Sequence, residues 1–298
     1  MHKSGFVNIL GKPNAGKSTL MNALLGEKMV IVSPKPQTTR HRILGILNSD
    51  EYQIVFSDTP GVIDKPSYKM HEAMSSFIHQ TFEDADVFIY LVTPEEKPDD
   101  HKETLAKIAD VHAPKFLVLN KSDLIDQAAI TLRLDAYRQT NIFQKYLAIS
   151  AKEQTGIDEL MTAIKEALPE GPEYFPKDQM TDRPERFFVT EIIREKILEQ
   201  YHQEVPYSCE VGIDEYKEGE GRDRDVTTIR ATIYVNRKTQ KPILIGRQGV
   251  SIKQLGIAAR QSIEKFIGTR VHLELFVKIR ENWRDDERAL KEFGYRNY

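Results

Sequence analysis

Cysteines, clustered metal ligands and long apolar runs are all scarce in this chain of 298 residues. Its single cysteine, Cys209, excludes an intrachain disulfide and is typical of a protein from a reducing compartment. The eight histidines are scattered, without the close Cys/His pairs of a structural zinc site. No stretch is apolar over the length of a membrane-spanning helix, and residues 1–10 lack the apolar core of a secretory signal. We therefore expect a cytoplasmic location, with peripheral contact at the inner face of the cell membrane as an open alternative.

Neither sign of charge dominates the chain, whose net charge is -3, but the charges are unevenly distributed. Residues 237–280 contain ten Lys/Arg and two acids, whereas residues 210–225 contain seven acids and three bases. Hydrophobic residues at 40% and charged residues at 29% are typical of a folded globular protein. A basic surface is therefore expected in the second half of the chain, and such a surface attracts nucleic-acid phosphates.

The first half of the sequence alternates short apolar runs with amphipathic segments, which predicts an α/β fold. We expect a mostly parallel sheet with helices on both faces and ligands beyond the carboxyl ends of its strands. Four prolines between residues 169 and 184 indicate a linker. The predicted domains are 1–170 and 185–298, joined by a linker at 171–184, and the predicted strands of the first domain are 5–10, 52–57, 87–92, 115–119 and 146–149.

A glycine-rich segment follows the first predicted strand and precedes a helical pattern, which is the context that the GxxxxGK(S/T) motif requires. Glycines let such a loop wrap a phosphate closely, so that backbone N–H groups point at it. Lys17 is expected to neutralise β and γ phosphates, and Ser18 to give a hydroxyl to Mg²⁺. The predicted phosphate-binding residues are Gly11, Lys12, Pro13, Asn14, Ala15, Gly16, Lys17, Ser18 and Thr19.

A D-x-x-G turn follows the second predicted strand, although alone this pattern is also that of an ordinary acidic turn. Its carboxylate is expected to hold the metal through water, and its glycine to approach a γ-phosphate. The preceding polar segment, 36–40, is expected to become ordered around γ-phosphate and Mg²⁺, with Thr39 preferred to Thr38 as the second hydroxyl ligand. The predicted switch residues are Thr38, Thr39, Asp58, Thr59, Pro60, Gly61 and Val62, and the predicted Mg²⁺ ligands are Ser18, Thr39 and Asp58.

Two further motifs follow the last two predicted strands of the first domain and indicate guanine recognition. The Asp123 carboxylate can accept parallel hydrogen bonds from guanine N1–H and N2–H₂, which adenine does not offer. A buried carboxylate without those partners is costly, so Asp123 predicts selectivity for GTP and GDP. The backbone N–H of Ala151 is expected to close the purine pocket. The predicted guanine-binding residues are Asn120, Lys121, Asp123, Ser150, Ala151 and Lys152.

The four motifs GKPNAGKS, DTPGV, NKSD and SAK together resemble the translation-factor-related P-loop GTPases, and their spelling is similar to the Era and EngA group. The resemblance covers about residues 1–170. It implies a GTP-hydrolysing switch in which GTP orders the Thr39 and Asp58 loops and hydrolysis releases them.

Val62 stands where the related Ras proteins carry the glutamine that orients the attacking water. Since valine has no hydrogen-bonding group, we expect slow intrinsic hydrolysis, with water positioned by backbone, ions or a partner. Asn14 resembles the asparagine with which related GTPases hold K⁺, although asparagine is also a common turn former. The predicted cofactor is Mg²⁺, with K⁺ as a second candidate.

The second domain is predicted as α+β, with the order α-β-β-α-α-β. Inside its basic stretch, residues 246–249 form a GxxG loop between two helical patterns. This arrangement resembles a type II KH domain, in which the loop grips a nucleic-acid backbone, although a plain helix–turn–helix is the alternative. The predicted RNA-binding residues are Gly246, Arg247, Gln248, Gly249 and Lys253.

A KH domain joined to a GTPase of this spelling resembles the Era family, the KH-domain GTPases of small-subunit assembly. The resemblance implies binding to 16S ribosomal RNA near its 3′ end and to the 30S subunit. Composition and spacing alone predict only GTP and RNA. Two alternatives stay open: a related GTPase acting on another RNA or the large subunit, and a GTP-dependent protein scaffold.

Overall fold

The computed structural model describes residues 2–62, 66–219 and 225–295, and the chain separates into two compact units. The first unit is Met1–Lys65 with Met74–Asp182, and the second is Pro66–Ala73 with Arg183–Tyr298. Residues 171–182, which the sequence predicts as most of a linker, belong to the first unit. The other predicted domain limits, 1–170 and 185–298, remain predictions.

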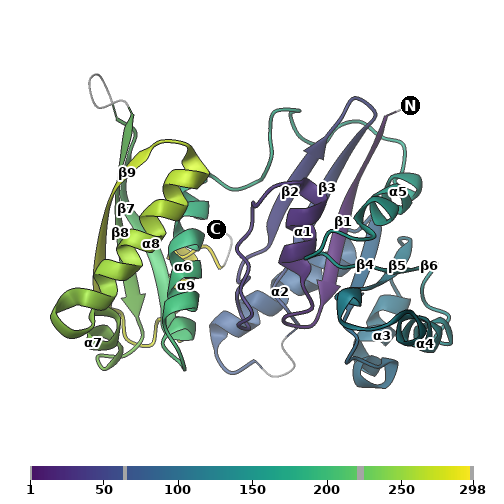
Figure 1. Cartoon of the computed structure of the whole chain (residues 1–298), viewed down its shortest axis with the longest axis horizontal. Coiled ribbons are helices and arrows are strands. Elements are labelled where there is room, and N and C mark those ends of the chain that lie inside the picture. The colour runs from purple at the N-terminus through teal and green to yellow at the C-terminus, as the bar shows by residue number, and fades with distance from the viewer. Residues whose placement is uncertain (1, 63–65, 220–224, 296–298) are drawn as a thin grey trace. The chain divides into compact units, whose positions relative to one another are not determined.

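Six strands form the sheet of the first unit, in the spatial order β2-β3-β1-β4-β5-β6 (Figure 1). Described neighbours pair in parallel, except β2 with β3, which are antiparallel. The predicted mostly parallel sheet is therefore confirmed, although β2 is not among the predicted strands. The strands are β1 (Lys3–Gly11), β2 (Ile43–Asn48), β3 (Tyr52–Asp58), β4 (Val87–Val92), β5 (Lys115–Leu119) and β6 (Lys145–Ala148).

Helices cover both faces of this sheet, as the sequence predicts. Alternate side chains of β4, such as Phe88 and Tyr90, pack in a hydrophobic core with Ile78, Ile108 and Leu134 from three helices on one face. Helices α1 and α5 contact each other on the opposite face (Figure 1). The helices are α1 (Lys17–Leu25), α2 (Lys69–Glu83), α3 (Lys102–Ala109), α4 (Gln127–Arg138) and α5 (Ile157–Ala167).

The segment that follows α5 is held along β2 and β3 by hydrogen bonds. The Gln53 side chain is fully buried; its Nε2 donates to Phe175 O (2.8 Å), and its Oε1 accepts from Tyr174 N (2.7 Å) and Phe175 N (3.0 Å). Further along, Ile46 N donates to Met180 O (2.8 Å). The predicted linker is thus attached to the sheet over much of its length.

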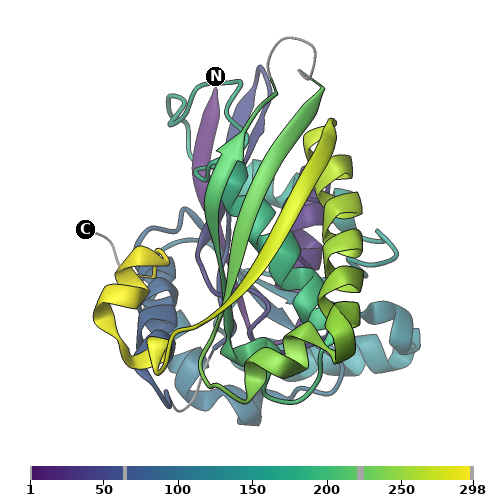
Figure 2. The same cartoon turned by 90° about the vertical axis from the view of Figure 1, so that its left-hand side faces the viewer.

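The second unit is a three-stranded sheet with the order β7-β8-β9, in which β8 is antiparallel to β7 and parallel to β9. Figure 2 shows helix α8 running beside this sheet. The predicted order α-β-β-α-α-β is confirmed, and a further short helix follows β9. The elements are α6 (Glu185–Gln200), β7 (Cys209–Lys217), β8 (Val226–Val235), α7 (Gln240–Ile245), α8 (Val250–Ile267), β9 (Arg270–Ile279) and α9 (Glu287–Glu292).

Among the residues that the structure describes, no helix combines the length and the apolar character needed to cross a bilayer.

Replacing Gln53 by Leu is expected to lower the free energy of unfolding by roughly 2–4 kcal/mol. Leucine has a similar volume but leaves two backbone N–H groups, one backbone carbonyl and the Asn48 side-chain oxygen without their partner. Urea unfolding followed by circular dichroism measures the change. Lys177→Ala, which removes only exposed ion pairs, should change stability by less than about 0.5 kcal/mol and serves as control. A Gln53→Leu variant as stable as the native protein would show that the attachment contributes nothing.

Candidate functional site

The motif-bearing turns of the first unit all follow strands that run in the same direction. β1 pairs in parallel with β3 on one side and with β4 on the other, β4 pairs in parallel with β5, and β5 with β6. Because the carboxyl ends of parallel strands meet at one edge of a sheet, the four motifs are brought to that edge. The structure therefore gathers residues that are separated by as much as 140 positions in the sequence.

The glycine-rich loop turns from β1 into α1 through two residues with left-handed backbone conformation. Asn14 has φ 64° and Gly16 has φ 96°, and α1 begins directly afterwards at Lys17. The unpaired N–H groups of the first turn of α1 therefore start at the loop, where they favour an anion. Asn14 is exposed and adopts a turn conformation, so its conformation fits the turn-forming alternative as well as ion binding.

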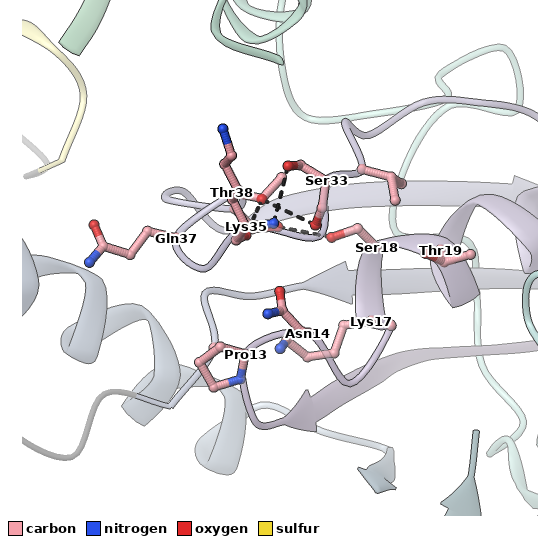
Figure 3. Close-up of a pocket in the computed structure, with 13 residues that line it drawn as sticks. Pro13, Asn14, Lys17, Ser18, Thr19, Ser33, Lys35, Gln37 and Thr38 are labelled. Atoms are coloured by element: carbon pink, nitrogen blue, oxygen red, sulfur yellow. Dashed lines mark hydrogen bonds between the residues drawn. The ribbon is translucent and has the colours of Figure 1, made fainter. Parts of the chain in front are cut away.

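A cavity separates this loop from the segment that precedes β2 (Figure 3). It is open to solvent, and the space of about 430 Å³ that it spans includes part of that solvent. No helix or strand forms between Gly26 and Arg42, a stretch that includes residues 36–40, for which the polar sequence predicts no stable element. The cavity is lined by Pro13, Asn14, Gly16, Lys17, Ser18, Thr19, Val32, Ser33, Lys35, Gln37, Thr38, Thr39 and Gly61.

The Lys17 ammonium lies inside the loop and is held by the loop's own backbone. Its Nζ donates to Gly11 O and Lys12 O, each at 3.0 Å, and the residue is only 6% exposed. Desolvation lowers the pKa of Lys17 to about 8, against the opposing attraction of Asp58 and Glu96. A phosphate that replaces the two carbonyls would bring a negative charge to an ammonium that is already desolvated.

Three oxygen-bearing side chains from separate segments meet beside Lys17. Ser18 Oγ donates to Asp58 Oδ2 (2.8 Å) and lies 2.9 Å from Thr39 Oγ1, which itself donates to Asp58 Oδ2 (3.1 Å). These are the three residues that the sequence predicts as Mg²⁺ ligands. Two hydroxyls and a carboxylate form an all-oxygen donor set, which suits a hard divalent cation. The donor set therefore fits Mg²⁺.

The other predicted switch residues take different positions. Thr38 Oγ1 donates to Lys35 O (2.6 Å) within its own loop, so Thr39 rather than Thr38 reaches Asp58. Thr59 is fully buried and its hydroxyl donates to Ile9 O (3.1 Å). Val62 packs against the hydrophobic core of the first unit.

Gly61 contacts the glycine-rich loop so closely that a side chain would not fit. A Cβ at this position would lie 2.8 Å from Pro13 N and 2.9 Å from Pro13 Cα, which are rigid backbone atoms. Any side chain at Gly61 would therefore displace either the D-x-x-G turn or the phosphate-binding loop.

Asn120 connects the loop to the last motif. Its side chain is almost fully buried; Nδ2 donates to Ala15 O (2.8 Å) and Oδ1 accepts from Ala151 N (3.0 Å). The Ala151 N–H that the sequence predicts to face a purine is thus used by Asn120 in this structure. A purine could accept a hydrogen bond from the Ala151 N–H only if it shared this donor with Asn120 Oδ1 or replaced that oxygen as the acceptor.

Asp123 lies in a 3₁₀ turn, Ser122–Leu124, and is exposed. The short turn presents this side chain to solvent. The cost of an unmatched carboxylate would arise only when a base covers it. Lys121 adopts a left-handed conformation (φ 59°), Ser122 N donates to Ile149 O (3.0 Å), and the Lys152 side chain is 82% exposed.

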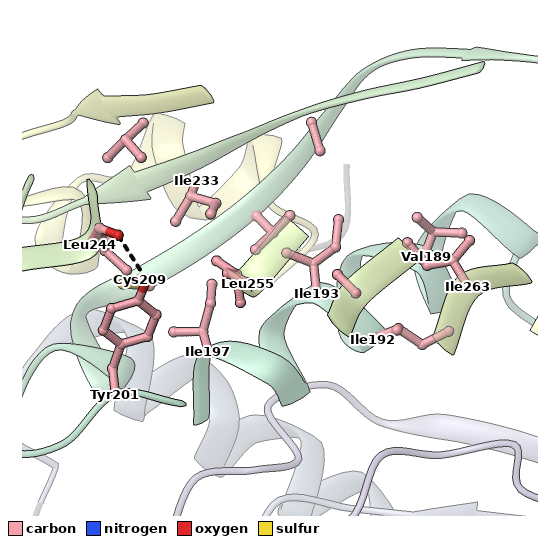
Figure 4. Packing of buried hydrophobic residues seen from close by; sticks show 14 of the residues in the cluster. Val189, Ile192, Ile193, Ile197, Tyr201, Cys209, Ile233, Leu244, Leu255 and Ile263 are labelled. Atoms are coloured by element: carbon pink, nitrogen blue, oxygen red, sulfur yellow. Dashed lines mark hydrogen bonds between the residues drawn. The ribbon is translucent and has the colours of Figure 1, made fainter. Parts of the chain in front are cut away.

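The GxxG loop of the second unit is built on a buried core (Figure 4). Leu244 and Leu255 are fully buried on either side of it, and Tyr201 Oη donates to Leu244 O (2.7 Å). Gly246 has φ 72° and ψ 174°, a conformation that side chains disfavour. Arg247 and the other residue between the glycines, Gln248, are exposed. The loop is therefore fixed by its helices while its polar side chains reach solvent.

Basic and apolar side chains surround this loop. Lys253 is exposed on α8, as are Arg237 and Lys238 before α7. Ile243 (52% exposed), Val250 (52%) and Ile257 (45%) are exposed on the same two helices and were not predicted as binding residues. The sequence could have indicated them, because they are apolar residues at helix positions that do not face the hydrophobic core. Such side chains suit contact with unstacked bases.

The segment before β2 supplies three cavity residues that the sequence did not indicate. Val32, Ser33 and Lys35 line the cavity together with the glycine-rich loop. The start of this segment is held by Asn22, whose side chain bonds Val30 N (2.9 Å), Val30 O (2.9 Å) and Met29 N (3.0 Å). No motif marks these residues, because their positions depend on a loop fixed by contacts distant in sequence.

Two family models match the chain, one for each unit. The model described as 50S ribosome-binding GTPase matches residues 6–121, and the KH domain model matches residues 204–284.

The chain is also similar to whole proteins over nearly its full length. It is 47% identical to GTPase Era of Geobacter metallireducens, with 98% of both chains covered. It is 46% identical to GTPase ERA1, chloroplastic, of Zea mays, over 99% of this chain and 71% of that protein. A solved structure of Era in complex with MgGDPNP and nucleotides 1506–1542 of 16S ribosomal RNA matches with TM-score 0.94 and 38% identity, covering 100% of both chains.

Nucleotide binding is expected to take up a proton at pH 8. The pKa of Lys17 is lowered to about 8, and a nearby phosphate raises it, so binding at this pH should draw about half a proton from solution. The affinity should accordingly be highest where Lys17 is protonated, below pH 8, and fall at higher pH. Calorimetric titration of GDP in two buffers of different ionisation enthalpy measures the uptake, and a repeat at pH 7 should show much less. Equal heats in both buffers at pH 8 would contradict the lowered pKa.

Proposed function

The chain belongs to the Era family of GTPases, and on this premise we propose that the protein is a GTP-hydrolysing switch that binds 16S ribosomal RNA near its 3′ end and assists assembly of the 30S subunit. The observation that carries the proposal is the meeting of Ser18, Thr39 and Asp58 beside the buried Lys17, in a chain whose other unit presents a GxxG loop. The full-length likeness to an Era structure with MgGDPNP and 16S RNA supports both ligands.

In the proposed nucleotide site, the loop from Gly11 to Ser18 surrounds the phosphates with backbone N–H groups, and Lys17 neutralises them. Ser18 and Thr39 hold Mg²⁺ directly, and Asp58 holds it through water. The bound ion supplies positive charge that stabilises the phosphate oxygens. Asp123 selects guanine at the other end of the site by accepting two hydrogen bonds from the base.

The same residues provide a switch. Thr39 contacts Ser18 and Asp58 directly, so a ligand that alters this cluster alters the position of a loop without regular structure. GTP with Mg²⁺ would hold Thr39 and Gly61 against the loop, and loss of the γ-phosphate would release them.

Hydrolysis in this site needs a water that Val62 cannot orient. Its side chain packs against the core and carries no polar atom, so backbone groups, ions or a partner must position the water. We propose K⁺ as a second cation, held by Asn14, because the Asn14 side chain is exposed and lines the phosphate cavity. A cation there would offset transition-state charge in the way that an arginine finger does.

In the proposed RNA site, Gly246 and Gly249 let a phosphate backbone approach, and Arg247, Gln248 and Lys253 supply charge and hydrogen bonds. The proposed place of action is the cytoplasm. Contact with the inner face of the cell membrane stays a prediction, and flotation with anionic vesicles tests it.

GTP hydrolysis is expected to be faster in K⁺ than in Na⁺ at matched ionic strength, which excludes simple screening. Asn14→Gly, which removes the side chain but allows the left-handed backbone of this turn (φ 64°), should lose the difference while retaining GDP binding, because the side chain contributes a cation ligand rather than the loop's N–H groups. Release of phosphate under single-turnover conditions measures the rates. If the native protein hydrolysed GTP at equal rates in K⁺ and Na⁺, Asn14 would have only a turn-forming role.

Replacing Arg247 and Gln248 together by Asp is expected to weaken RNA binding at least ~10-fold, because acids facing phosphates remove contacts and add repulsion. The dependence of affinity on salt should become shallower, and GTP affinity should not change. Fluorescence anisotropy with a labelled single strand measures both. Lys265→Asp combined with Gln261→Asp, two exposed positions on α8, lowers the net charge by the same amount and is the control for altered net charge. If the double variant kept full affinity and slope, RNA would bind elsewhere, with Arg237, Lys238 and Lys241 as the next candidates.

A further inference from the structure

Gly256 occupies an unfavourable place for glycine, near the middle of the 18-residue helix α8. Glycine loses more backbone freedom on folding than any other residue and is, after proline, the least favourable residue inside a helix. A glycine is needed where a turn, a positive φ or a close contact leaves no room for a side chain.

The fold of the second unit does not require this glycine. Gly256 is absent from the positive-φ residues of the described chain, in contrast to Gly246 (φ 72°). Among described residues beyond its own helix, a Cβ at Gly256 would have one neighbour within 4 Å, Leu275 Cδ1 at 3.7 Å, which is an ordinary van der Waals contact. An alanine therefore fits, and it would also favour the helix.

Gly256 lies beside the basic face of α8. Lys253 precedes it by three residues and Arg260 follows by four, so the three positions share one side of the helix. Both cations are exposed, although Arg260 NH1 lies 3.8 Å from Glu264 Oε1 in a weak ion pair. Leu275 belongs to β9, one of the two edge strands of the sheet, and α8 runs beside this sheet (Figure 2). The bare helix backbone thus lies between two cations at the margin of the sheet.

We propose that Gly256 is an RNA-binding position because of the side chain that it lacks. A single strand gripped by the GxxG loop continues along α8, with its phosphates near Lys253 and Arg260 and one nucleotide against the backbone at Gly256. These two cations are about 10 Å apart along the helix, which leaves space for a nucleotide between them. A methyl group at residue 256 would occupy the space of that contact. The inference rests on the proposed RNA-binding function and adds a residue that determines how closely the strand approaches.

Gly256→Ala in the full-length protein separates this role from a structural one. The urea midpoint of the second unit should rise by roughly 0.3–0.8 M, because alanine favours the helix. The single tryptophan, Trp283, is buried in the second unit and reports its unfolding by fluorescence. Affinity for a single strand with the sequence of nucleotides 1506–1542 of 16S RNA should fall at least ~10-fold, with GTP affinity unchanged.

The salt dependence distinguishes a steric effect from an electrostatic one. Gly256→Ala changes no charge, so the slope of log affinity against log salt should equal the native slope, whereas Lys253→Ala should reduce it by about 1. Gln261→Ala, exposed on another side of α8, should keep native affinity and serves as the matched control.

A Gly256→Ala protein that is more stable but binds RNA normally would overturn the inference, and so would one that is less stable, because the fold would then need the glycine. If the native protein failed to bind the probe, the proposed RNA function would itself be wrong. Native binding with normal Gly256→Ala affinity would remove only the role of Gly256.

Discussion

The buried ammonium of Lys17 is the interaction on which the rest of the nucleotide site depends. Removing this charge from water is unfavourable, as the lowered pKa indicates, and the cost is offset by two carbonyls of the same loop and by the attraction of Asp58. Asp58 in turn accepts hydrogen bonds from Ser18 and Thr39. On the other side, Asn120 fixes Ala15 to Ala151. The loop is therefore preorganised around a positive charge before any phosphate enters.

The two units differ in how they present positive charge and backbone groups to phosphates. Both bind phosphates, but the first surrounds a compact anion with backbone N–H groups and a buried lysine, whereas the second presents an exposed loop and exposed cations to an extended strand. Glycines act differently in the two. Gly61 is required by contact with Pro13 inside the chain, whereas no described residue requires Gly256. This difference is the reason for assigning Gly256 a role toward a ligand.

The sequence predicted the short-range features well. The GxxxxGKS loop, the Asp58 turn and the GxxG loop each need particular residue types at fixed spacing, so their positions follow from local backbone geometry. Features set by distant contacts were missed. Residues 43–48 carry no alternating pattern yet form β2 beside β3, and the attachment of residues 174–180 depends on a buried Gln53 more than 120 positions away. The double hydrogen bonding of Asn120 and the exposure of Asp123 likewise depend on how separate turns meet, which no single motif encodes.

The proposed function joins, in one chain, a GTP switch to recognition of the 3′ end of small-subunit RNA. Ultraviolet crosslinking of the GTP-bound full-length protein in cells, with sequencing of the attached RNA and identification of the crosslinked peptide, tests it most directly. We expect reads concentrated in the single-stranded 3′ end of 16S RNA, attached to the peptide that contains residues 246–249. Reads from large-subunit RNA, or crosslinks from this peptide to protein alone, would contradict it.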